Sequence, residues 1–250
     1  MSKLFLFITL LLFSINCLSF TLNSSTGDHF TDPNVTVDIS NNSCTNAGMT
    51  SDELLTMAMQ AAELYWNSIP TCKLNLKKGS IVNVDISTQT GVAADFNVVT
   101  DNHILVGCNA DTTKLFKGGS DKTTLALGAL YNNKGIVYIN NTPNTPIPST
   151  SEAQKVATVA HEMGHAFGLG HSQKEYALMY YQLGLIQERL SYDDMDGCHY
   201  LYNRSGAVNC ASVDIDSKGS GPGSRNNFIA LLIGFFGLII SCKYITKRIG

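Results

Sequence analysis

Three histidines lie within eleven residues of the sequence, at positions 161, 165 and 171. The first two belong to the pentapeptide HEMGH at 161–165. A spacing of four places both imidazoles on one face of a helix, where they can reach the same ion. Glu162 then stands beside that ion and can address a water molecule on it. The pattern predicts a zinc site with Glu162 beside its bound water.

A tetrahedral catalytic zinc needs a third protein ligand and one open position for water. His171 can supply this ligand if the helix ends soon after His165, and Gly168 tolerates the left-handed turn needed there. The segment 149–152 offers a capping box that starts the helix. We therefore expect one zinc ion bound by His161, His165 and His171. The other three histidines lack ligand spacing and are expected to be ordinary core or surface residues; they are His29, His103 and His199.

The composition predicts a folded protein rather than a disordered or nucleic-acid-binding one. Of the 250 residues, 44% are hydrophobic and 15% charged, with a net charge of −3. So apolar a chain is expected to form a packed core. No long basic run is present, so no nucleic-acid partner is expected.

Both ends of the chain are hydrophobic. Lys3 followed by an apolar stretch predicts a signal peptide over 1–19, with an uncleaved anchor or a lipid-modified Cys17 as alternatives. An apolar run with a basic end predicts a transmembrane or sorting segment over 226–250, with the main domain outside. A buried core helix or a lipid-anchor signal is the alternative there. Between the ends we expect one catalytic domain over 20–210 and a flexible linker over 211–225.

Five of the seven cysteines lie in the central domain, and none forms a Cys-x-x-Cys pair. In an oxidising compartment, two disulfides and one leftover thiol are expected, with the pairing open. The five are Cys44, Cys72, Cys108, Cys198 and Cys210. Five Asn-X-Ser/Thr sequons would accept glycans in a eukaryote or are chance matches in an Asn-rich chain; they are Asn23, Asn34, Asn41, Asn140 and Asn203.

The hydrophobic pattern alternates between strand and helix along the central domain. A helix is expected from Ser51 or Asp52 to Trp66, ended by Pro70. The proline-rich stretch 141–148 is expected to be a loop. Strands are predicted over 35–39, 81–86, 104–106, 125–131 and 135–140.

Met179 lies eight residues after His171, within the sequence YALMY. With a methionine at this place after the zinc motif, the sequence resembles the metzincin clan of zinc metalloproteases, in which a methionine-bearing turn follows the motif. Ser172, the short spacing of the turn and the segment LSYDDMDG at 190–197 make the sequence most similar to the matrixins. The resemblance implies an α+β fold with a twisted mixed sheet of about five strands. An N-terminal helix, an active-site helix and a C-terminal helix complete this expected fold.

The resemblance also implies a zinc endopeptidase that hydrolyses peptide bonds of extracytoplasmic proteins through a zinc-bound water. Glu162 would be its general base, and Met179 would form the hydrophobic floor under the metal. Protein or peptide substrates would lie extended along an edge strand, beside a specificity pocket formed around 180–190. The expected edge-strand residues are Leu125, Leu127, Gly128 and Ala129.

The sequence also departs from the matrixin pattern. No cysteine-bearing latency segment is recognisable, His103 stands alone where a structural zinc would be bound, and calcium binding stays open. Tyr181 occupies a position where the family usually has proline. A catalytically inactive binding module or a non-hydrolytic metal-binding protein remains an alternative, although an intact Glu162 favours the enzyme. We expect a monomer at the cell surface, membrane-anchored or secreted after processing.

Overall fold

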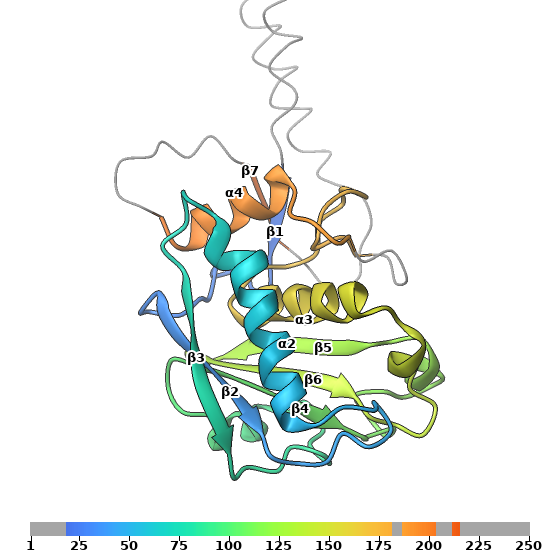
Figure 1. Cartoon of the computed structure of the whole chain (residues 1–250). Coiled ribbons are helices and arrows are strands. Elements are labelled where there is room, and N and C mark those ends of the chain that lie inside the picture. The colour runs from blue at the N-terminus through green and yellow to red at the C-terminus, as the bar shows by residue number, and fades with distance from the viewer. Residues whose placement is uncertain (1–18, 182–186, 204–211, 216–250) are drawn as a thin grey trace, which may run out of the picture. The chain divides into compact units, whose positions relative to one another are not determined.

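The computed structural model describes residues 19–181, 187–203 and 212–215 (Figure 1). The chain divides into two compact units, Met1–Asp216 and Ser217–Gly250. All described residues belong to the first unit. The predicted signal peptide up to residue 18 and the predicted segment 226–250 therefore lie outside the described residues. Among the residues that are described, none of the helices combines the length and the apolar character needed to cross a membrane.

A five-stranded sheet forms the centre of the first unit, with strand order β3-β2-β4-β6-β5. All neighbouring strands are parallel except β5 and β6, which are antiparallel, so the predicted mixed sheet of five strands is confirmed. The strands are β2 (Asn34–Ser40), β3 (Asn75–Val82), β4 (His103–Asn109), β5 (Ala126–Tyr131) and β6 (Lys134–Asn140).

The sheet is covered on both faces, as parallel strands require. Alternate residues of β4 show this directly. Ile104 and Val106 belong to the larger core cluster with helices α2 and α3, whereas Leu105 belongs to a second cluster with Phe96 and Phe116 from the loops. Figure 1 shows α2 and α3 on the same side of the sheet.

Three α-helices are described, and all three were expected. They are α2 (Ser51–Leu64), α3 (Glu152–Ala166) and α4 (Tyr192–Leu201). The cap of α2 is Thr50 rather than Ser51 or Asp52, because Thr50 and Glu53 form a capping box. Short 3-10 helices follow or connect these elements: η2 (Trp66–Ser68), η3 (Ala93–Val98), η4 (Ser120–Lys122) and η5 (Ile147–Ser149).

The position of β3 corrects the sequence prediction. A strand was expected over 81–86, but β3 ends at Val82. The chain turns there, with the Val84 N–H donating to the Val82 carbonyl, and Ile86 then enters the second core cluster. The apolar pattern at 81–86 therefore combines the last two residues of β3, which pair with β2, with a turn that leads Ile86 into the core.

A second, two-stranded parallel sheet pairs β1 (Ser19–Leu22) with β7 (Ser212–Ile215). The hydrophobic pattern did not predict β1, and β7 lies in the stretch expected to be a linker. Beyond this pairing, Leu22 forms an antiparallel bridge with Leu169. The N-terminal strand therefore lies beside the segment that follows α3.

Two disulfides cross-link the first unit. Cys44 pairs with Cys108, and Cys72 pairs with Cys198 across 126 residues. The second bond attaches α4 to the segment after α2. Cys210 lies outside the described residues.

Candidate functional site

Helix α3 carries the first two histidines where the motif predicted them. Ser151 caps the helix and accepts from the Gln154 N–H. From this start the helix packs against α2. In η2, directly after α2, the Trp66 Nε1–H donates to the Ala160 carbonyl at 2.8 Å. His161 and His165 follow one turn apart and are both buried.

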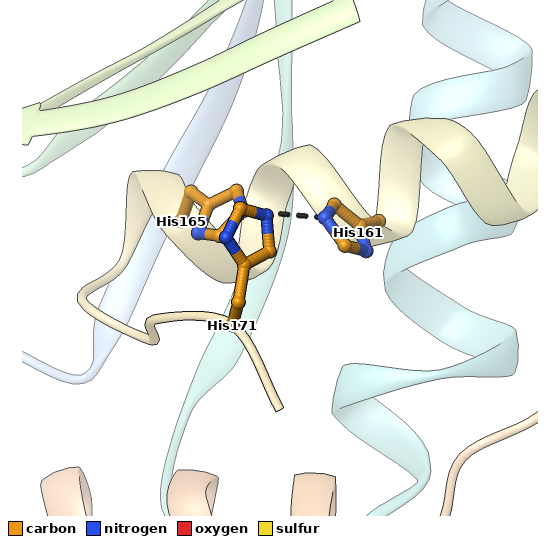
Figure 2. A group of neighbouring side chains, drawn as sticks. All are labelled: His161, His165 and His171. Atoms are coloured by element: carbon orange, nitrogen blue, oxygen red, sulfur yellow. Dashed lines mark hydrogen bonds between the residues drawn. The ribbon is translucent and has the colours of Figure 1, made fainter. Parts of the chain in front are cut away.

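The turn after α3 brings the third histidine back to the first two. The helix ends at Ala166, and Gly168 adopts a φ of +120°, which a residue with a side chain rarely tolerates. His171 then faces the helix, as Figure 2 shows. The Nε2 atom of His165 lies 3.2 Å from that of His161 and 3.1 Å from that of His171.

Hydrogen bonds on the far side of two rings fix their tautomer. The Nδ1 atom of His161 lies 2.6 Å from the Leu178 carbonyl, and that of His165 lies 2.8 Å from the Leu169 carbonyl. Carbonyl oxygens only accept, so each Nδ1 carries the proton and each Nε2 presents a lone pair. Burial lowers the pKa of His161 to about 4 and holds that of His165 well below its usual value, so both rings are neutral at pH 7.

This arrangement fits a tetrahedral metal ion. Two lone pairs pointing at each other across about 3 Å repel unless a cation lies between them. A tetrahedral zinc with bonds of about 2.0–2.1 Å would separate its ligand atoms by about 3.3 Å, close to the separations of the neighbouring Nε2 atoms. Among the described residues, His161, His165 and His171 are the group of three whose ligand atoms converge in this way.

Glu162 lies in the same cleft as the histidines. The cleft has a volume of about 440 Å³, and all three histidines and Glu162 line it. Burial raises the pKa of the Glu162 carboxyl to about 8, while a hydrogen bond from the Gly128 backbone N–H opposes this rise. A divalent cation beside the carboxyl would also favour its charged form. Glu162 is therefore placed to hold or release a proton near neutral pH.

The strand β5 forms one wall of the cleft and is an edge of the sheet, as predicted. Leu125, Leu127 and Gly128 line the cleft, although Leu125 lies one residue before the strand begins. Ala129 belongs to the strand but not to the cleft lining; it packs against the second core cluster. Thr158, Tyr180 and Tyr181 also line the cleft. The predicted pocket around 180–190 is described only in part, because residues 182–186 lie outside the described ranges.

Met179 lies against the helix between the two histidines. It is buried, and a Cβ added to Gly164 would lie 2.4 Å from its Sδ atom. Its turn is held from both sides: the Leu178 carbonyl accepts from His161, and the Ser172 N–H donates to the Met179 carbonyl.

The structure adds a residue that sequence reasoning missed, Asp194 of α4. Its carboxylate accepts the backbone N–H groups of Leu178 at 2.9 Å and Met179 at 3.0 Å. It also accepts from the backbone N–H of Ser191 at 2.7 Å. Burial raises the pKa of Asp194, and these hydrogen bonds oppose the rise. In the sequence the segment 190–197 indicated only the resemblance to the matrixins, and nothing in the local pattern pointed to the turn at 178–179.

The three remaining histidines make other contacts. His103 pairs with Asp38 at 2.6 Å, His199 bonds to the Thr71 carbonyl, and the His29 ring bonds to the Gly27 carbonyl. None joins the metal-ligand group found among the described residues.

The chain is similar to a solved structure, to a plant relative and to a family model. The chain matches a solved structure, the archaemetzincin of Methanopyrus kandleri, over 68% of its own length and 97% of that chain, with 11% identity and a TM-score of 0.45. It is 32% identical over 108 residues to metalloendoproteinase 2-MMP of Arabidopsis thaliana. That match covers 37% of this chain and 29% of the plant protein, so the chain spans less than a third of its relative. The model of the matrixin peptidase family matches residues 30–203, which is most of the chain and includes every site residue described above, and the chain therefore belongs to the matrixin family.

Proposed function

We propose that the protein is a zinc-dependent endopeptidase that cleaves peptide bonds of proteins outside the cytoplasm. The observation that carries the proposal is the convergence of three imidazole Nε2 atoms beside the Glu162 carboxyl in one cleft. Family membership supports the same activity. His161, His165 and His171 would hold the zinc ion, which supplies a Lewis acid that polarises the peptide carbonyl and acidifies water.

The residues of the chain then have distinct tasks. Glu162 lines the cleft beside the three histidines, where its carboxyl accepts a proton from the attacking water and delivers it to the leaving amine. Within the described residues, β5 has no strand on its outer edge, so an extended peptide can pair with its backbone there. Main-chain pairing of this kind favours peptides over small molecules. Met179 supports the two helical ligands from below.

The two disulfides support an extracytoplasmic location, because such bonds persist in oxidising compartments. Anchoring through 226–250 remains a prediction from the sequence.

The test is cleavage of denatured casein by the purified protein, beside the variant Glu162→Gln. Loss of the general base should lower the rate by about 10²–10⁴-fold and leave the zinc content at one ion per chain. Glu152→Gln is a matched control, because Glu152 lies on the same helix, is exposed and pairs only with Lys155. Chelation of zinc should abolish cleavage. A folded protein that binds one zinc but cleaves nothing would contradict the proposal and favour a binding module.

A further inference from the structure

The third histidine is the one ligand that α3 does not position. His161 and His165 are fixed by helix geometry, whereas His171 lies in the extended segment 168–171 that follows. Such a segment has few hydrogen bonds of its own, so a neighbour must hold it. The neighbour in this structure is β1 with the residue that follows it.

Four hydrogen bonds join residues Thr21 and Asn23 to the segment from His165 to His171. The Thr21 carbonyl accepts from the Gly170 N–H at 3.0 Å, and the Thr21 hydroxyl donates to the carbonyl of His171 itself. The Asn23 N–H donates to the Gly168 carbonyl at 3.0 Å, and the Asn23 Nδ2 donates to the His165 carbonyl at 3.0 Å. Two metal ligands therefore have their backbone carbonyls bound by side chains from the N-terminal segment.

The fit between the two segments is close. A Cβ on Gly170 would lie 2.4 Å from the Thr21 Oγ1 and 2.9 Å from the Leu22 carbonyl carbon. A glycine at position 170 is therefore required by the N-terminal segment and not only by the turn.

Two apolar side chains anchor the N-terminal segment. Phe20 and Leu22 are both 3% exposed. The Phe20 ring contacts the Tyr200 ring of α4 with centroids 5.3 Å apart, and Leu22 forms the bridge to Leu169. Thr21 lies between these anchors, so its hydroxyl is held in place against His171.

We propose that Thr21 and Asn23 are positioning residues that set the place of His171 and thereby the affinity for metal. This inference rests on the proposed function, because it assumes that the three histidines bind zinc. Outer-shell partners of metal ligands typically affect affinity by about 10–100-fold when they are removed. The N-terminal segment is thus part of the metal centre, although it is about 140 residues away from α3 in the sequence.

The experiment measures the zinc dissociation constant of the full chain by competition with a chromophoric chelator. The variants are Thr21→Val, which removes the hydroxyl at nearly constant volume, and Asn23→Ala. Each should raise the zinc dissociation constant by about 10-fold, and the double variant by about 10–100-fold. Thr21→Ser keeps the donor and should restore affinity close to that of the unsubstituted protein.

Matched controls separate positioning from general stability. Thr26→Val and Asn34→Ala remove side-chain hydrogen bonds to Asp28 and Asp32. The Thr26 and Asn34 side chains are exposed, and neither of these bonds involves 165–171. Their zinc affinity should stay within about 2-fold of the original. Thermal unfolding of the zinc-free proteins is measured in parallel, because a merely structural role would lower Tm and leave the dissociation constant unchanged.

Each result decides the inference. Unchanged zinc affinity in the double variant would overturn it and leave the proposed function standing. Failure of the unsubstituted protein to bind zinc would overturn both. If Thr21→Val does not fold, the exposed Asn23 carries the test alone, since removing its side chain disturbs no core packing.

Discussion

Gly128 provides a sharp test of how the cleft is built, because β5 crosses α3 there without room for a side chain. A Cβ on Gly128 would lie 2.0 Å from the carbonyl oxygen of Glu162 and 2.8 Å from its carbonyl carbon. Non-bonded carbon and oxygen atoms rarely approach closer than about 3.3 Å. Gly128→Ala must therefore move the strand and the helix apart by on the order of 1 Å. Both contacted atoms are helix backbone, which cannot rotate aside as a side chain would.

The expected effect is larger on catalysis than on stability. Overpacking costs about 1–3 kcal/mol, and replacing glycine in a strand returns about 0.5–1 kcal/mol. The free energy of unfolding should fall by about 1–2 kcal/mol, and Tm by about 2–8 °C for a domain of this size. A misplacement of about 1 Å between catalytic groups and substrate costs about 10²-fold in rate. We therefore expect kcat/KM to fall about 100-fold.

The assay combines thermal unfolding with hydrolysis of a fluorogenic peptide at saturating zinc. Gly48→Ala is the control, because Gly48 has a φ of +69° and no atom within 4 Å of an added Cβ. This control should lose about 1 kcal/mol through backbone strain and keep its kcat/KM. The reasoning is refuted if Gly128→Ala retains kcat/KM within about 3-fold of the original. A change that small is far below the roughly 100-fold loss expected for a 1 Å shift.

Two further predictions concern buried carboxyl groups. Asp194→Asn replaces an acceptor of backbone N–H groups with an amide that can accept on only one side, so unfolding free energy should fall by about 1–3 kcal/mol and zinc should bind more weakly. Asp196→Asn is the control, because Asp196 lies two residues further along α4 and is only partly buried. It should change neither the unfolding free energy in a urea titration nor the zinc affinity in the chelator assay. Glu162 has a folded-state pKa of about 8 against 4.5 when unfolded, so its contribution to stability is full below pH 4.5 and is lost as the pH rises through 8. Zinc-free protein should therefore lose about 2 kcal/mol of unfolding free energy between pH 6.5 and 8. The variant Glu162→Gln should lack this loss, because its side chain does not titrate. Equal losses in the two proteins would contradict the raised pKa of Glu162.

The parts of the site that the sequence predicted are those that local geometry determines. The spacing of His161 and His165 needs only a helix, and the turn at Gly168 needs only a residue that tolerates positive φ. Strands β2, β4, β5 and β6 were found because their apolar residues alternate or cluster between turn residues. In each case the information lies within about ten residues of the feature.

The parts that were missed depend on partners far apart in the chain. The bond from Thr21 to His171 joins residues 150 positions apart, and the three residues of β1 that follow Ser19 are too few to show a period. The role of Asp194 was missed because its hydrogen bonds to Leu178 and Met179 join α4 to a separate turn. The pairing of the cysteines was open for the same reason: sequence reveals which residues can bond but not which ones meet.

The attachment of α4 also sets the time at which the metal centre can be completed. A chain emerges from its amino end at about 5–20 residues per second, and early segments fold first. The helix with the first two histidines emerges before α4. The turn that carries Met179 is hydrogen-bonded to Asp194 of α4, and the disulfide of Cys72 cannot form until Cys198 has emerged. The centre therefore closes last, after nearly the whole domain has emerged. Its finished geometry is a property of the fully delivered domain and not of the nascent chain.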